Sequence, residues 1–160
     1  MPFDPVRHLL AAIAFRFHAA VHDAPDAFRD FDPGHGVRSP RTIVAHCVHV
    51  LRLARSSFEP GLDVEGPVRE HHTWAELVAE VHGELERLDR HVVEGDPTFD
   101  WPLENLLHGP FADVLTHVGQ LAMLRRLHGH PVERQSYLRA RLEAGRLAPE
   151  DQPAPAPPML

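Results

Sequence analysis

The sequence is almost free of cysteine and has no stretch that resembles a membrane span or a signal peptide. Its single thiol, Cys47, excludes an intramolecular disulfide framework and a cysteine-rich zinc finger. No apolar run approaches the roughly 18 residues of a membrane-spanning helix. The stretch Met1 to Pro5 carries acid and proline where a signal peptide needs basic residues. We therefore expect a cytoplasmic protein with no membrane partner.

A basic surface for nucleic acid is also missing. The chain carries 16 basic and 23 acidic side chains, for a formal net charge of −7, and it has no basic run. Binding to a phosphate backbone or an anionic membrane surface needs the opposite balance. Glycine-rich phosphate loops, G-x-S-x-G elbows and H-E-x-x-H helices are absent as well. The sequence therefore predicts no nucleic-acid partner and none of the enzyme classes that these motifs mark.

What the sequence does contain is an ordinary globular composition with many histidines. Its 160 residues are 43% hydrophobic and 24% charged, which suits one folded domain with a core. The 14 histidines are unusual, because histidine titrates near neutral pH and ligates metal ions. The search for a functional site therefore starts with them.

Apolar residues recur at helical spacing in four stretches, at about residues 6–21, 40–58, 73–92 and 111–128. Ser39 before Pro40 predicts the start of the second helix, and Thr73 with Glu76 forms a capping-box pattern for the third. No segment alternates with period two and there is no internal repeat. These features predict an all-α fold, a four-helix bundle.

The connections and the C-terminal part complete this prediction. The loops at residues 24–40 and 59–72 are longer than about 12 residues, which is unusual for a bundle and suggests a functional end. Phe28 and Phe31 are expected to hold the first loop against the core. A shorter amphipathic helix is expected from Tyr137 to Leu147. We therefore predict a bundle domain over residues 1–147 and a disordered, flexible proline-rich tail over residues 148–160.

Two histidines stand out because of their place on the predicted helices. At about 100° per residue, His46 and His117 fall on the flanks of the apolar stripes of the second and fourth helices. Asp113 precedes His117 by one helical turn, so both side chains lie on one face. One carboxylate, two imidazoles and an open position resemble a catalytic zinc centre. The alternative is an interior pair in which His117 hydrogen-bonds Asp113 without a metal.

Other candidates have simpler interpretations. His49 lies one turn beyond His46 and is a candidate for enlarging or orienting the site, although exposure is the simpler interpretation. Cys47 is a candidate nucleophile, but its place on the apolar stripe favours a buried hydrophobe. The pair His71-His72 is a candidate for a pocket rim. Four aromatic residues are candidates for a pocket lining or for core packing: Phe31, Trp74, Phe99 and Trp101. Six further histidines are expected to be solvated surface residues: His8, His18, His22, His82, His91 and His130.

The run from Ala112 to Val132 resembles the last core helix of the DinB family, the DinB/YfiT-like metalloenzymes. It contains the pattern H-x-G-Q-L, followed by L-R-R and G-x-P-V. The stretch from Ser39 to His46 is similar to the first metal-ligand helix of that family and lies at the expected distance upstream. The resemblance covers nearly the whole chain except the proline-rich tail.

The resemblance implies a four-helix bundle, often a homodimer, that holds a divalent metal ion. His46 and His117 match two ligand positions, while Asp113 stands where the commonest pattern has a third histidine. A carboxylate oxygen suits zinc, nickel or manganese, and zinc or nickel is the first expectation. Members of the wider family include thiol-dependent S-transferases and isomerases, which implies a small-molecule substrate and a low-molecular-weight thiol. A hydrolase that uses metal-bound water needs the same three ligands.

Two other functions remain open at this stage. The first is a non-catalytic dimeric helical bundle without a functional metal site, which acts as a binding or stress-associated protein. The aspartate at position 113 favours this interpretation. The many histidines can also sense pH, since their protonation near pH 6 offsets much of the negative charge.

Overall fold

The computed structural model describes residues 4–66, 73–98 and 101–158, and every regular element in these ranges is helical. The long helices are α1 (Pro5–Val21), α2 (Pro40–Ser56), α3 (Trp74–Glu94) and α5 (Ala112–Leu127). The short elements are η1 (Asp26–Asp30), α4 (Leu103–Leu106), η2 (Leu107–Phe111), η3 (Tyr137–Arg139) and η4 (Pro149–Asp151). The all-α prediction is therefore confirmed, and no helix in the described ranges has the length and apolarity to cross a membrane.

The predicted helix starts are present as capping interactions. Ser39 Oγ accepts a hydrogen bond from the Thr42 amide at 3.3 Å, with Pro40 at the first helical position. At the start of α3, Thr73 Oγ1 accepts from the Glu76 amide while the Glu76 carboxylate accepts from the Thr73 amide at 2.7 Å. These caps satisfy amide groups that have no partner within the helix.

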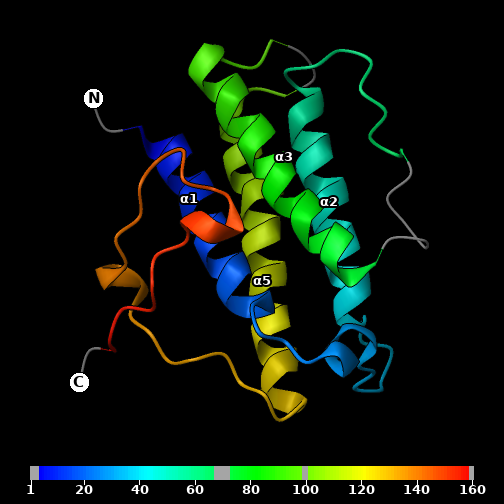
Figure 1. Ribbon diagram of the computed structural model, residues 1–160. Helices are drawn as coiled ribbons and strands as arrows, with labels where there is room; N and C mark the ends of the chain where they lie inside the picture. The colour runs from blue at the N-terminus through cyan, green and yellow to red at the C-terminus, as the bar shows by residue number, and fades with distance from the viewer. Residues whose placement is uncertain (1–3, 67–72, 99–100, 159–160) are drawn as a thin grey trace.

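The four long helices form a ring in which α1 and α2 each contact both α3 and α5 (Figure 1). Figure 1 also shows that α2 and α3 run in one direction and α1 and α5 in the other. The connection from α1 to α2 therefore joins opposite corners of the ring. The connection from α2 to α3 runs back from the end of α2 to the level at which α2 began. Parallel neighbours need such long connections. This topology accounts for the two long loops of the sequence.

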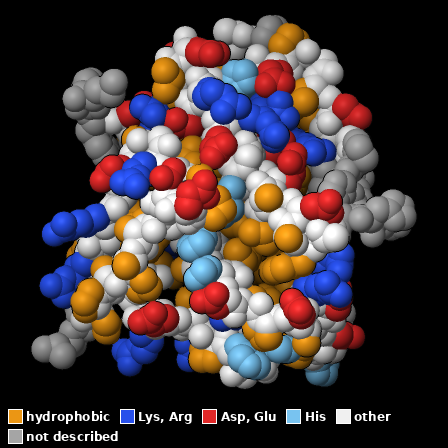
Figure 2. Space-filling model, viewed as in Figure 1, with side chains coloured by type: hydrophobic (Ala, Val, Ile, Leu, Met, Phe, Trp, Pro, Cys, Tyr) orange, Lys and Arg blue, Asp and Glu red, His pale blue; other side chains and the backbone are white. Residues whose placement is uncertain are grey.

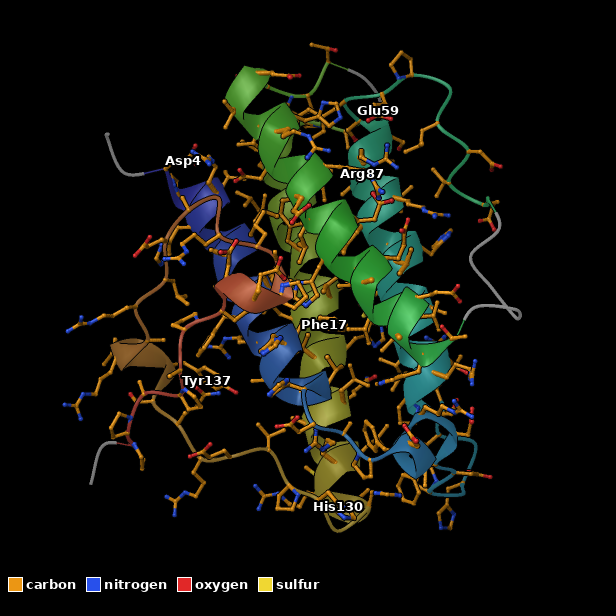
Figure 3. All side chains as sticks on the ribbon, viewed as in Figure 1. Asp4, Phe17, Glu59, Arg87, His130 and Tyr137 are labelled. Carbon is orange, nitrogen blue, oxygen red and sulfur yellow. The ribbon has the colours of Figure 1, made fainter. Side chains whose placement is uncertain are left out.

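The core follows the predicted apolar stripes. The largest side chains with almost no exposed surface include Phe17, Phe28 and Phe111, and Figure 3 labels Phe17 near the middle of the helix group. Phe28 belongs to η1 and is 0% exposed, so the connection after α1 is held against the core as predicted. Most of the predicted stripe residues are buried: Val6, Leu10, Ile13, Ala14, Val21, Ile43, Cys47, Val50, Leu51, Ala54, Leu77, Val81, Leu85, Leu88, Val114, Val118, Leu121 and Leu124.

The last long helix starts earlier than the sequence predicts. α4 and the π-helical turn η2 lead directly into α5, so the chain is helical from Leu103 to Leu127. Pro110 lies inside η2. Proline lacks an N–H and its ring collides with the carbonyl one turn earlier, whereas the wider π-turn gives it room. This local widening ends just before Asp113.

The prediction of a helix from Tyr137 to Leu147 is wrong, because the only regular structure in this segment is the 3₁₀ turn η3 at its start. The side chains of this segment pack on α1 instead: Arg16 Cζ lies 3.9 Å from the centroid of the Tyr137 ring, and Figure 3 shows Tyr137 beside α1. Gly145 has φ of +87°, a left-handed conformation that interrupts a helix. Leu147 is 0% exposed and joins the core.

The proline-rich tail has some local structure in its described part, residues 148–158. It forms the short turn η4, and the Gln152 amide group donates to the Ala148 carbonyl at 2.8 Å. The Ser136 amide donates to the Ala156 carbonyl at 2.9 Å. The flexibility of the tail stays a prediction.

The expectation that His82 is a solvated surface residue is wrong, because only 2% of its surface is exposed. Its Nδ1 lies 2.6 Å from the Leu147 carbonyl oxygen. Its ring also makes an edge contact with Phe17, at a centroid distance of 5.5 Å. The C-terminal segment covers this part of α3, and nothing in the local sequence of the helix indicates that cover.

Candidate metal centre

α2 and α5 bring the three predicted ligands together at one place between them. His46 Nε2 lies 3.4 Å from Asp113 Oδ2, and His117 Nε2 lies 3.6 Å from the same oxygen. The two imidazole rings meet edge to face, with centroids 4.7 Å apart. One ligand atom from each of the three residues lies within 4.8 Å of the others, so this group can hold a metal ion.

The two contacts to Asp113 match the spacing of ligands around a small divalent cation. Zinc binds imidazole nitrogen and carboxylate oxygen at about 2.0–2.2 Å, and a tetrahedron of that size separates its ligand atoms by about 3.4 Å. The two measured contacts to Asp113 Oδ2 are 3.4 and 3.6 Å. Both exceed the usual length of a charged hydrogen bond, about 2.7–2.9 Å. The arrangement therefore fits a shared cation better than a tight Asp–His pair.

A fourth side chain fixes the orientation of His117. Gln120, one turn further along α5, has its Oε1 2.8 Å from His117 Nδ1. An amide oxygen only accepts, so Nδ1 carries the hydrogen and, in the neutral ring, Nε2 keeps its lone pair. This Nε2 atom faces Asp113 and lies 3.6 Å from its Oδ2. Histidine ligands of metal ions commonly have such a partner on the other ring nitrogen.

The electrostatics of the site favour a neutral ligand at His46. Burial is the main cause that lowers the pKa of His46 below its ordinary value of 6.5, and the nearby charges of His117 and Arg38 act in the same direction. Asp113 opposes them without reversing the shift. A neutral imidazole is the form that binds a metal ion. The lowered pKa therefore favours the form of His46 that can act as a ligand.

A pocket of about 590 Å³ opens beside the three residues and has His117 in its wall. The α1–α2 connection contributes Val37 and Arg38 to the lining, and α5 contributes Gln120 and Met123. The side chain of His117 is 10% exposed, while those of His46 and Asp113 are 32% and 45% exposed. A small molecule can therefore approach the site from solvent, and the long connection forms part of its wall.

The other sequence candidates do not join this group of three ligands, or they lie outside the described residues. His49 Nδ1 lies 3.6 Å from Glu65 Oε1. Cys47 is buried, and burial raises the pKa of its thiol to about 12, which confirms the predicted buried hydrophobe. The pair His71-His72 and Phe99 lie outside the described residues. Trp101 is exposed, whereas Phe31 and Trp74 pack on the core.

Sequence reasoning missed the roles of Gln120 and Arg38. The role of Gln120 could have been predicted from the sequence, because a residue one turn after His117 lies on the same helix face. Arg38 gives no such signal, since it reaches the pocket from an irregular connection whose path depends on the packing of η1.

Taken together, the described residues define an all-helical protein with a His–Asp–His group that can hold a metal ion beside an open pocket. Comparisons of the chain with protein-family models, with curated proteins and with solved structures found no match. The DinB resemblance therefore stays a hypothesis that rests on the residue patterns.

Proposed function

We propose that the protein is a DinB-like metal-dependent enzyme built on a four-helix bundle, with a divalent ion held between α2 and α5. The observation that carries the proposal is the convergence of His46, Asp113 and His117 at ligand spacing. Two imidazoles and one carboxylate leave a coordination position open for a reactant, as in catalytic zinc sites. Zinc or nickel is the first choice, and manganese accepts the same ligands.

A divalent ion held there would supply Lewis acidity, which would lower the pKa of a bound water or thiol towards neutral pH. The residues of the chain have separate tasks around it. Gln120 keeps His117 in the tautomer that offers Nε2, and Asp113 contributes the negative charge that offsets part of the charge of the ion. The apolar part of the pocket wall, with Val37 and Met123, excludes water from one side of a bound substrate.

Two reactions are compatible with this arrangement. In the first, the site would hold a low-molecular-weight thiol that gives up its proton to solvent; its sulfur would form a bond to an electrophilic carbon held in the pocket as the bond from that carbon to its leaving group breaks. In the second, the site would hold a water that hydrolyses a substrate. The pattern from His117 to Val132 favours the thiol reaction through the resemblance to the DinB family. The homodimer and the cytoplasmic location are parts of the same proposal.

The test is the metal content of the purified, tag-free chain, measured by inductively coupled plasma mass spectrometry after reconstitution with zinc or nickel. The variants are His46→Ala, Asp113→Ala and His117→Ala, and the matched control is His49→Ala, which removes a neighbouring imidazole whose Nδ1 lies near Glu65. We expect close to one metal ion per chain in the wild type and the control and almost none in the three variants.

Each result has a defined meaning. Metal lost only in the histidine variants assigns Asp113 to hydrogen bonding rather than to ligation and overturns the three-ligand site. No metal in the reconstituted wild type overturns the metal-dependent function and leaves a non-catalytic helical bundle that binds a partner. Once metal binding is shown, turnover of an electrophile with and without added thiol distinguishes S-transfer from hydrolysis.

A further inference from the structure

The pocket beside His117 has a polar end and an apolar end. α5 lines it with His117 and Gln120 at one end and with Met123 and Leu127 further along the same face. From His117 to Leu127 an α-helix rises about 15 Å, since each residue adds about 1.5 Å. The pocket is therefore long enough for a chain or ring system of small-molecule size that starts near the candidate metal ligands.

The apolar end is exposed to an extent that is unusual for large hydrophobic side chains. Val37, Met123 and Leu127 are 50%, 57% and 60% exposed, and all three line this pocket. Contact between apolar side chains and water is unfavourable, so a cluster of exposed apolar residues commonly marks a binding site. Here the cluster is concave and continuous with the polar end, as small-molecule sites are.

The described lining of the pocket carries one fully charged side chain, and its charge is positive. Arg38 is the one charged residue that lines the pocket within the described part of the chain. Its neighbours in sequence use their charges within the protein: Arg29 and Arg41 both pair with Asp30, at 2.9 and 2.8 Å. Arg38 makes no hydrogen bond or ion pair with the described residues, and its charge acts on nearby His46. The guanidinium is thus available to an anionic group at the end of the pocket near the candidate metal ligands.

We propose that this pocket binds a small amphipathic monoanion, with its anionic head at Arg38 and its apolar body along Met123 and Leu127. That this anion is a substrate rests on the proposed function, because its head then lies next to the candidate metal ligands His46 and His117. The binding itself depends only on charge complementarity with Arg38 and on burial of the apolar body.

The probe is decanoate, a linear monoanion, titrated into the full chain by isothermal calorimetry. The titration is made with one equivalent of zinc and again after dialysis against EDTA. The variants are Arg38→Gln, which removes the charge of the pocket, and Leu127→Asp, which places a carboxylate in its apolar end. The control is Arg126→Gln, which removes the same charge from α5 at a residue that does not line the pocket. Circular dichroism verifies that each variant is folded.

We expect one saturable site whose affinity for decanoate falls at least tenfold in Arg38→Gln and in Leu127→Asp and less than twofold in Arg126→Gln. The cation decyltrimethylammonium, which has the same chain, is expected to bind at least tenfold more weakly than decanoate. Equal affinity in the wild type and Arg38→Gln, or the absence of a saturable site, overturns the proposal.

Repeating the titration with Asp113→Ala separates the two proposals, because Asp113 does not line the pocket. Decanoate binding that persists in Asp113→Ala supports the pocket independently of the metal, whereas the metal-dependent function fails only if the reconstituted wild type holds no metal. Metal binding with no decanoate site overturns the assigned substrate class and leaves the proposed function in place.

Discussion

α2 makes two polar interfaces with its neighbours, and they differ in how their charges are satisfied. Towards α3, Glu84 is 0% exposed and receives hydrogen bonds from Arg52, Arg55 and Arg87 at 2.7–3.3 Å. Towards α5, Asp113 faces two imidazoles at 3.4 and 3.6 Å and no guanidinium within the described residues. Figure 2 shows the arginine and acidic side chains of the first interface gathered over the upper part of the molecule, where Figure 3 labels Arg87 and Glu59.

The first interface is complete without a ligand. Arg52 also pairs with Glu80, and Arg55 with Glu59, so the three arginines are matched by three carboxylates, those of Glu59, Glu80 and Glu84. Each acid is close to a donor whose charge compensates its own, which is the condition under which buried charge is tolerated.

The second interface has acceptors in excess. With Gln120 fixing the tautomer of His117, its Nε2 and Asp113 Oδ2 face each other as acceptors, and only a cation or an additional proton satisfies both. The comparison teaches that saturated polar contacts mark a structural role, while converging acceptors with an open side mark a binding role.

The largest expected effect is on stability at the first interface. Replacing Glu84 by glutamine leaves its arginine donors without the buried negative charge, which we expect to cost about 3–5 kcal/mol in the free energy of unfolding. Asp113→Asn, the matched change at the second interface, is expected to cost less than about 1 kcal/mol, because that carboxylate pairs with no guanidinium of the described residues. Urea unfolding measures both. Equal losses in the two variants would show that both carboxylates are structural.

The second prediction concerns stabilisation by the ion. Zinc at about 100 times its dissociation constant adds about 2.7 kcal/mol to the stability of the folded chain. For a domain of this size that corresponds to a rise in Tm of about 5–11 °C, measured by differential scanning calorimetry. The rise is expected to vanish in Asp113→Ala. The same rise in that variant means that zinc binds elsewhere on this histidine-rich chain.

A smaller effect is expected from the residue that orients His117. Gln120→Ala removes the hydrogen-bond acceptor for His117 Nδ1, and we expect zinc affinity to fall about 10–100-fold, measured by competition with a chromogenic chelator. Gln120→Glu keeps an acceptor at that position, so its affinity should stay close to that of the wild type. A loss of the same size in Gln120→Glu contradicts the orienting role.

The fourth prediction tests a buried histidine that forms no ion pair with the described residues. Burial is the largest cause that lowers the pKa of His82 below 6.5, and its Nε2 is buried without a hydrogen-bond partner. Below about pH 6.5 the unfolded chain binds a proton at this residue that the folded chain does not, so stability falls as the pH drops from 7 to 5. Urea unfolding of His82→Gln should show a shallower decline, although His18 and His46, whose pKa values are also lowered, still contribute.

The exposed His130 supplies the control for that experiment. His130→Gln is expected to keep the pH dependence of the wild type. A decline that is equally steep in His82→Gln and in the wild type means that the pH dependence arises at other groups.

The smallest effect is expected at His49. Its ring lies near that of His46, with centroids 6.3 Å apart, but its Nδ1 lies 3.6 Å from Glu65. His49→Ala should therefore change zinc affinity less than twofold in the same chelator assay. A larger loss extends the metal site to this turn of α2.

Much of the fold was predictable because helical spacing and capping are local properties of the chain. The stripe from Ile43 to Ala54 and the box formed by Thr73 and Glu76 required only neighbours within one or two turns. The π-turn around Pro110 was not predictable, since an isolated proline marks a break as readily as a wide turn. The predicted C-terminal helix failed for a similar reason: Tyr137 and Leu147 gain more from packing on α1 and the core than from helix formation.

The sequence by itself determined the four long helices, their buried faces and the spacing of Asp113 and His117, because these depend on the geometry of a single helix. Only the tertiary structure decided that His46 meets that pair, that Arg38 reaches the pocket and that His82 is buried under the C-terminal segment. These contacts join residues that are distant in the chain. They depend on which helices become neighbours and on where the long connections lead, and helical periodicity carries no information about either.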